Sequence, residues 1–429
     1  MKKELLLFLF LFTAVISYAQ TQQVNGVVID SQTKEVLPFV NISIEGSNQA
    51  ATTDIDGKFS IASAKKISTL LFSYVGYELK RYPLRDSSAT IPNLVIKLES
   101  KHINLSEITI RPGEDRAQRL MRIVHTNRDK NDPEKLRSFS YDSYNKFVVT
   151  SRKDSGTAGN NFGIHVEVTT SGKPTDSAAQ KEMDNFFEKQ NLFLMESVTT
   201  RKYMKPGKNQ ERILASRVSG ISNPQFMLLA TQLQSFSFYN DLIYISNKKY
   251  VSPLSKEGLR SYFFVIEDTL FSGNDTLFTI SFRPGKGENF DGLKGVININ
   301  THGYAVQNVI AEPADRKQAK IKIQQNYELV DNRYWFPAQL NADMLIADNL
   351  VGISHSYIQH IKLEPELDKK TFNRFELEMA DDVKNKSEAF WNAYRVDTLT
   401  EKDKKTYVVI DSIGKESKLD GALNLLMGL

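Results

Sequence analysis

The sequence contains no cysteine, so this chain of 429 residues has neither a disulfide nor a thiol nucleophile. It also lacks a charge excess of either sign, with 55 basic and 51 acidic side chains and a net charge of +4. Basic blocks of the kind that bind nucleic acid are missing, and we expect no nucleic-acid partner. Because no disulfide can stabilise the fold, stability must come from buried apolar surface, which a chain that is 41% hydrophobic can supply over two or three domains.

Histidine is scarce too, and the motifs of common enzymes are missing. None of the six histidines has a glutamate three residues later, and no H-E-x-x-H or G-x-S-x-G motif occurs. His355 and His360 are the closest pair, but their odd spacing on a strand predicts opposite faces, which disfavours a shared metal. Gly285-Lys286-Gly287 lacks the third glycine of a nucleotide loop. We therefore assign no catalytic, metal or cofactor-binding residue and expect no cofactor.

The first twenty residues contain the one long apolar run of the sequence. Lys2 and Lys3 precede an apolar stretch over 5–16, and small residues at 17 and 19 predict cleavage between Ala19 and Gln20. This pattern predicts a signal peptide over 1–19, because the run is shorter than the roughly 20 apolar residues that cross a bilayer. We expect an exported protein, in the periplasm or at the periplasmic face of the outer membrane, without a transmembrane helix.

Residues 20–100 predict a small β-sandwich, because short alternating runs are separated by turn residues. Gly26 marks a close approach within the first strand, and Pro38 precedes a second strand that we expect to begin at Phe39. Asp56 and Gly57 lie in a turn that requires a positive φ, and Gly76 ends a later strand.

The acid pair of that turn, Asp54 and Asp56, also allows a calcium interpretation. Thr52 and Ala62 or Ser63 stand where further acidic ligands would be needed, so a plain hairpin turn is favoured.

The order V-x-G-x-V-x-D, L-P-x-V-x-I, T-x-D-x-D-G-x-F-x-I and L-x-F-S-Y-V-G-Y-E resembles the carboxypeptidase-like regulatory domain. The resemblance implies a transthyretin-like sandwich of about seven strands, as in other small Greek-key sandwiches. That family is an accessory module beside a zinc peptidase and not the peptidase itself. In bacteria with starch-utilisation-type transporters, similar domains precede outer-membrane barrels.

Residues 101–136 predict a connector with a helix over 114–130 that ends at Asp132-Pro133. This helix and the following FSYDSYNKF segment resemble an uncharacterised family. Its members carry the regulatory-like domain first and usually an outer-membrane β-barrel last.

Residues 137–380 predict an antiparallel β-meander domain with a few helices, an α+β layer, so the whole chain is mainly β with some α. Helices are expected over 177–190 and 226–233. The run G-x-L-K-G-x-I-x-I-N followed by Y-W-F-P resembles the open half-barrel of periplasmic lipoprotein carriers. Tyr334 and Trp335 could stack on a sugar, although core packing is favoured.

Residues 381–429 predict a helical tail with helices over 387–395, 402–410 and 419–429. The tail also resembles the segment that precedes the barrel of the uncharacterised family, and the chain ends there, as a truncated product or a soluble variant.

Three functions remain open from the sequence. The leading interpretation is a non-enzymatic exported module that docks to or binds a protein partner in outer-membrane transport or assembly, with a glycan or a lipid as an alternative ligand. A periplasmic lipid or lipoprotein carrier is the second interpretation. The third is a hydrolase whose acids converge only in the fold, which predicts carboxylates with perturbed pKa in a cleft.

Overall fold

The structure is a computed structural model that describes residues 21–85, 88–101, 115–151, 188–220, 237–245, 248–287, 290–315, 320–347, 350–372 and 377–413. The chain divides into a first unit, residues 1–104 with 270–274, and a second unit, residues 105–269 with 275–429. The predicted signal peptide, the helix over 226–233, most of the helix over 177–190 and the segment over 419–429 lie outside the described residues.

The first unit contains two small sheets that face one another. Three strands pair in the order β4-β1-β7 and four in the order β3-β2-β5-β6. The strands are β1 (Gln22–Asp30), β2 (Asn41–Ile44), β3 (Ala50–Thr52), β4 (Lys58–Ser63), β5 (Thr69–Ser73), β6 (Lys80–Pro83) and β7 (Thr90–Leu98). Phe59 and Phe72, one from each sheet, meet edge to face at 5.6 Å between ring centroids inside one apolar core. The predicted sandwich is confirmed.

One strand begins later than the sequence pattern predicts. Phe39 has a φ of +59°, so β2 starts at Asn41. Thr53 fixes the segment that leads into β2, because its Oγ1 accepts from the Val40 amide at 2.8 Å and donates to the Leu37 carbonyl at 2.8 Å. Alternation alone does not reveal a side-chain hydrogen bond that replaces ladder pairing.

The second unit begins with helix α2 (Arg116–Asn131). Asp115 caps its start by accepting from the Ala117 amide at 2.9 Å, and Asp132 ends it in an extended conformation before Pro133. The short helix η1 (Pro133–Lys135) follows directly and is capped by the same Asp132. The predicted end of the connector helix at Asp132-Pro133 therefore agrees with the structure.

A large sheet follows, with eleven strands in the described residues, in the order β13-β14-β15-β16-β17-β18-β19-β8-β9-β10-β20. Its strands are β8 (Ser138–Ser151), β9 (Phe193–Met204), β10 (Lys208–Gly220), β13 (Tyr262–Ser272), β14 (Asp275–Pro284), β15 (Leu293–Asn300), β16 (Ala305–Pro313), β17 (Ile321–Val330), β18 (Tyr334–Ala347), β19 (Leu350–Leu363) and β20 (Leu377–Met379). The predicted hairpins from β13 to β19 form the meander. Two features differ from it: β20 pairs parallel to β10, and β8 pairs with β19, far along the chain.

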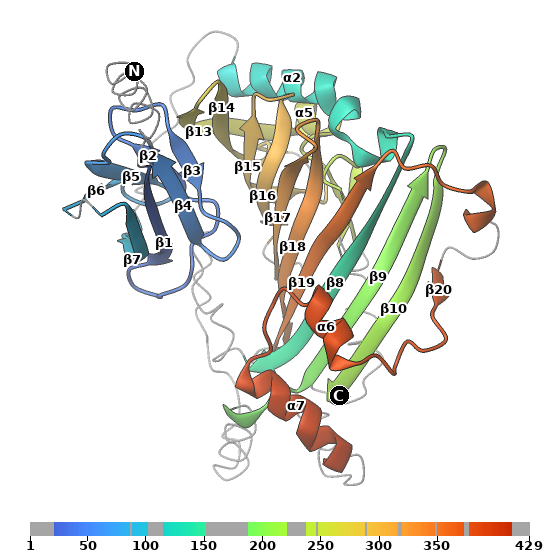
Figure 1. The fold of residues 1–429 in the computed structure, drawn as a ribbon. Helices are drawn as coiled ribbons and strands as arrows, with labels where there is room; N and C mark the ends of the chain where they lie inside the picture. Colours follow the sequence, from blue (N-terminus) through green and yellow to red (C-terminus); the bar gives the residue numbers. More distant parts are fainter. Residues whose placement is uncertain are drawn as a thin grey trace, which may run out of the picture. The chain divides into compact units, whose positions relative to one another are not determined.

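Smaller elements complete the unit. They are β11 (Leu242–Ile245), β12 (Lys248–Val251), α5 (Gly258–Ser261), η3 (Lys369–Phe372), α6 (Glu388–Tyr394) and α7 (Glu401–Ile413). Figure 1 shows α2, in turquoise, across the strands around β16, and α6 and α7, in red, near β8 to β10. None of the described helices combines the length and apolarity that crossing a bilayer demands.

The two faces of the sheet are covered by different elements. On the face that we call the α2 face, Phe147 and Ile297 share one apolar core with Met121 of α2. On the opposite face, the tail face, Tyr144 and Tyr357 pack against Trp391 of α6. Alternation along β8 assigns Tyr144 and Phe147 to these opposite faces. Each face of the sheet therefore has its own packed cluster.

Candidate functional site

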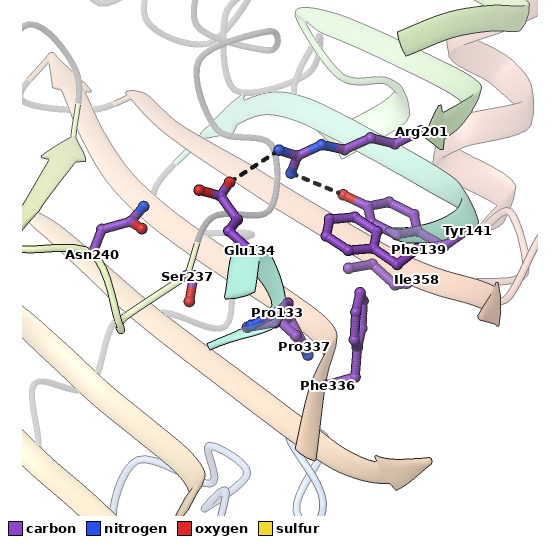
Figure 2. Close-up of a pocket in the computed structure, with 10 residues that line it drawn as sticks. All are labelled: Pro133, Glu134, Phe139, Tyr141, Arg201, Ser237, Asn240, Phe336, Pro337 and Ile358. Carbon is purple, nitrogen blue, oxygen red and sulfur yellow. Dashed lines mark hydrogen bonds and ion pairs between the residues drawn. The ribbon is translucent and has the colours of Figure 1, made fainter. Parts of the chain in front are cut away.

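A pocket opens on the second unit beside η1, and Figure 2 shows the residues that surround it. Its volume is about 220 Å³. Strands β8, β9, β18 and β19 contribute to it, together with η1 and the segment before β11. It is lined by Pro133, Glu134, Phe139, Tyr141, Arg201, Ser237, Asn240, Phe336, Pro337 and Ile358. We call this the aromatic pocket.

The walls of the aromatic pocket are fixed by ring packing. Phe139 stacks on Tyr203 with 4.9 Å between ring centroids and lies 5.9 Å from Tyr141 in a parallel arrangement. Phe336 meets the edge of this stack at 5.3 Å from Phe139. Phe139 and Phe336 are each only 1% exposed, so neither ring can move without disturbing its neighbours. The pocket is preformed.

Arg201 is the cation of the aromatic pocket. Its Nε donates to Asn209 Oδ1 at 2.8 Å, Nη1 contacts the Tyr141 hydroxyl at 3.4 Å, and Nη2 contacts Glu134 Oε1 at 3.3 Å. Burial disfavours its charge, but Tyr141 and the carboxylates of Glu134 and Glu211 raise the pKa of Arg201 above its ordinary value. The guanidinium therefore stays charged beside an apolar wall.

The size of the pocket limits what it can hold. A volume of 220 Å³ equals the liquid volume of roughly seven waters at about 30 Å³ each. Ligand pockets commonly measure about 300–1,000 Å³. The aromatic pocket can therefore hold a small ring system or the end of an acyl chain, and not an entire lipid.

A second cavity of about 500 Å³ adjoins η1, and most of the residues that line it are charged or polar. Asp132, which is 7% exposed, lies in its wall, and burial raises the pKa of this carboxyl. The wall is formed by Asp129, Lys130, Asn131, Asp132, Lys135, Leu136, Arg137, His302, Gly303, Arg333, Tyr334 and Glu364. We call it the charged cavity; η1 contributes residues to both cavities.

The tail face carries a network of buried charges centred on Glu196 of β9, which is 0% exposed. One carboxylate oxygen accepts from Tyr144 Oη at 2.7 Å and Arg395 Nε at 2.7 Å. The other accepts from Arg395 Nη2 at 3.0 Å and Tyr407 Oη at 2.6 Å. Burial acts to raise the pKa of Glu196, but the hydrogen bonds from Arg395, Tyr407 and Tyr144 outweigh it and lower the pKa. This charged group fastens α6 and α7 to the sheet.

A second ion pair joins α7 to the same strands. Lys146 Nζ lies 2.9 Å from Asp403 Oδ2, and the two side chains are 10% and 5% exposed. Asn191 Nδ2 donates to Asp403 Oδ1 at 2.8 Å, and the Thr400 amide donates to Oδ2 at 3.0 Å. Asp403 is thus fully engaged at the start of α7.

The tail face also holds a histidine–carboxylate cluster. Asp397 accepts from Tyr357 Oη at 2.7 Å and lies 2.8 Å from His355 Nδ1. Burial opposes the charged imidazole, yet Asp397 and Asp343 together raise the pKa of His355. Burial raises the pKa of Asp343. In the described part of the chain, no group of three or more histidine and acidic side chains is placed to hold a metal ion.

The prediction that His355 and His360 point to opposite faces is wrong. His360 Nδ1 lies 3.0 Å from Asp142 Oδ2, and Asp142 is on the tail face with Tyr144. A β-bulge between Gln359 and Lys362, with a φ of +52° at His360, shifts the alternation there. Each histidine nevertheless has its own carboxylate partner.

The predicted turn residues and the predicted cleavage site belong to the first unit. A Cβ on Gly26 would lie 2.2 Å from the Leu94 carbonyl oxygen, and Gly57 and Gly76 have φ of +71° and +84°. The Asp56 amide donates to Asp54 Oδ1 at 3.0 Å within the turn, and Pro38 is buried. The bond between Ala19 and Gln20 lies outside the described residues.

The two aromatic residues considered for sugar stacking, Tyr334 and Trp335, are both half-buried. Trp335 packs against the α2-face core, and its Nε1 donates to the His302 carbonyl at 3.0 Å. Tyr334 borders the charged cavity.

Sequence reasoning did not find the aromatic pocket. Arg201 is flanked by Thr200 and Lys202 and has no distinguishing pattern. Its partner Glu134 is 67 positions away in sequence. The nearest signal was the tyrosine-rich FSYDSYNKF segment, which contains Phe139 and Tyr141 but was noted only for its family resemblance.

Comparison with known proteins assigns two parts of the chain to two family models. Residues 24–110 match the CarboxypepD_reg-like domain, which confirms the resemblance seen in the first unit. Residues 120–362, more than half of the chain, match the Family of unknown function (DUF5686). The chain belongs to this family.

A curated relative is the TonB-dependent receptor P3 of Formosa agariphila, 29% identical over 110 residues. This match covers 26% of the chain, and the chain spans about a tenth (10%) of the receptor's length. A DUF1329 family protein from Desulfovibrio piger aligns with a TM-score of 0.27 and 10% identity, covering 60% of this chain and 98% of that one. A LolA superfamily protein from Nitrosomonas europaea aligns with a TM-score of 0.25 and 8% identity, covering 61% of this chain and 99% of that one.

Proposed function

We propose that the chain is a non-enzymatic binding protein of the cell envelope that serves outer-membrane transport or assembly. The observation that carries this proposal is the regulatory-like domain over 24–110, together with the similarity to a TonB-dependent receptor. The predicted signal peptide over 1–19 supports export to the periplasm or the periplasmic face of the outer membrane. The partner is an outer-membrane or periplasmic protein.

The second unit supports a binding role. Its aromatic pocket combines buried rings with one arginine and with polar side chains such as Ser237 and Asn240, and ligand sites use such polar groups to orient a ligand. The charged network of the tail face, by contrast, has its hydrogen-bonding capacity occupied at Glu196 and Asp403. We therefore assign binding to the aromatic pocket, and we assign to the tail face the role of attaching α6 and α7 to the sheet.

Fractionation of the native host tests the location, and cross-linking in intact cells tests the partner. We expect the chain in the envelope fraction and cross-linked to an outer-membrane protein. The mature chain should release no product from peptide, ester or glycoside substrates above the rate of a buffer control. A cytosolic location, or turnover that co-purifies with the chain and is lost on substitution of one of its residues, contradicts the proposal.

A lipid or lipoprotein carrier is the alternative that the apolar pocket walls favour. The aromatic pocket alone holds only the end of an acyl chain, so a carrier needs further space. Native mass spectrometry of the purified chain decides between the two: a co-purifying lipid at one per chain supports the carrier.

A hydrolase is the alternative that the His355 cluster favours, because two carboxylates, Asp343 and Asp397, lie near a histidine of raised pKa. In the described residues no serine or threonine hydroxyl is hydrogen-bonded to His355, so the cluster supplies an acid–base pair only. Turnover that His355→Gln abolishes and His360→Gln leaves intact would establish this alternative.

A further inference from the structure

We propose that the aromatic pocket binds the apolar end of a small carboxylic acid, whose carboxylate pairs with Arg201. This inference rests on the proposed binding role and names the ligand class for it. A free aryl or medium-chain acid and the carboxyl terminus of a protein partner share this chemistry.

The pocket wall contains two aromatic rings and one aliphatic side chain. Phe139, Phe336 and Ile358 line the pocket and are 1%, 1% and 8% exposed, so they form a fixed apolar floor that opens little surface to solvent. An apolar group of a ligand that reaches this floor leaves water and gains contact with the rings. A preformed pocket adds to affinity, because little ordering accompanies binding.

Arg201 makes one short hydrogen bond and two longer contacts. Nε is fully engaged with Asn209 at 2.8 Å, whereas the contacts of Nη1 and Nη2 are 3.4 and 3.3 Å. Charge-assisted hydrogen bonds between a guanidinium and a carboxylate are usually about 2.7–2.9 Å long. The two terminal nitrogens are therefore loosely held and suitably arranged for a bidentate carboxylate.

Glu134 is the internal competitor. Its side chain is 42% exposed, whereas that of Arg201 is 22% exposed. The carboxylate of Glu134 is already partly hydrated, so its rotation into water costs little free energy. The guanidinium of Arg201 lies 5.7 Å from the Phe139 ring centroid and is less exposed, so it remains stabilised by a nearby negative charge. A ligand carboxylate can thus replace Glu134, and a cationic ligand would have to displace Arg201 from a more buried place.

Isothermal titration calorimetry of the full mature chain with 1-naphthoate tests the inference. Neutral 1-naphthamide and cationic 1-naphthylmethylammonium are the matched probes for charge. N-acetylphenylalanine and its amide are the matched probes for a peptide carboxyl terminus. We expect each acid to bind more tightly than its amide, and the tighter of the two acids identifies the source of the ligand.

Three variants are expected to change the affinity for naphthoate in different ways. Arg201→Gln should weaken naphthoate binding by about tenfold to a hundredfold, the usual effect of a lost hydrogen bond to a charge. Arg201→Lys should retain part of the affinity, because the charge remains and the bidentate geometry is lost. Glu134→Gln should tighten naphthoate binding by about threefold, because the competing exposed ion pair is removed.

Arg212→Gln is the control, because it removes the same charge from an exposed site on the neighbouring strand β10. Equal affinity for acid and amide, no binding of either acid at millimolar concentration, or weaker acid binding to Glu134→Gln overturns the inference. Since Glu134 is partly exposed, that variant remains informative if Arg201→Gln does not fold. The location and cross-linking results do not depend on the pocket, so failure here is distinguishable from failure of the proposed function.

Discussion

Glu196 makes a prediction that can be worked out from its contacts. Substitution by alanine removes a fully buried carboxylate that accepts hydrogen bonds from Tyr144, Arg395 and Tyr407. It leaves the guanidinium of Arg395, which is only 8% exposed, without its main counter-ion. Removal of one partner of a buried ion pair typically costs about 3–5 kcal/mol.

The loss should be local, because two of the four hydrogen bonds come from Arg395, directly after α6, and one comes from α7. We expect faster hydrogen exchange in peptides that cover 388–413, by roughly two to three and a half powers of ten at about 1.4 kcal/mol per factor of ten. Exchange in β14 to β17 should stay unchanged, because their core lies on the α2 face. Hydrogen exchange with mass spectrometry measures both regions in one experiment.

Glu401→Gln is the control, since its pair with Lys404 is exposed on the surface of α7. We expect no measurable change in exchange for this variant. Unchanged exchange of α6 and α7 in Glu196→Ala would refute the view that this buried charge fastens the tail. An equal rise across the whole sheet would show instead that the carboxylate supports the entire unit.

Two further predictions concern charge and backbone packing. The raised pKa of His355 means that its pairing with Asp397 stabilises the fold below the unfolded value near pH 6.5 and is lost as the pH rises through the folded value. The exchange protection of α6, corrected for the intrinsic rate, should therefore fall above about pH 6.5 in the native chain and in the control variant His360→Gln. In a His355→Gln variant it should not change with pH. A parallel fall of protection in His355→Gln contradicts this prediction. Gly295→Ala places a Cβ 1.9 Å from the carbonyl oxygen of the facing strand β16, so we expect a loss of about 1–3 kcal/mol and a thermal midpoint lower by several degrees in calorimetry; an unchanged midpoint would show that the strands separate freely there.

Much of the fold was predictable because its signals are local. The turn at Asp331 and Asn332, both with positive φ, joins two strands whose alternation was visible in the sequence. Ser387 caps α6 through the Phe390 amide, and the spacing of Phe390, Trp391 and Tyr394 predicted that helix. Such features depend on neighbours within a few positions.

The candidate sites were not predictable, because they combine residues that are distant in sequence. Tyr407 reaches Glu196 across 211 positions, and Arg201 meets Glu134 across 67. No periodicity links such positions. The histidine prediction failed for a related reason, since a single bulge in β19 reverses the alternation on which the argument depended.

The pairing of β8 with β19 has a consequence for how the chain folds. Asn145 of β8 and Ser356 of β19 are hydrogen-bonded and 211 residues apart, although β8 is the first strand of the large sheet to be synthesised. Until β19 has emerged from the ribosome, β8 has an open edge that invites pairing with other chains. A chaperone that covers the edge of β8 during synthesis would therefore keep it from pairing with other chains.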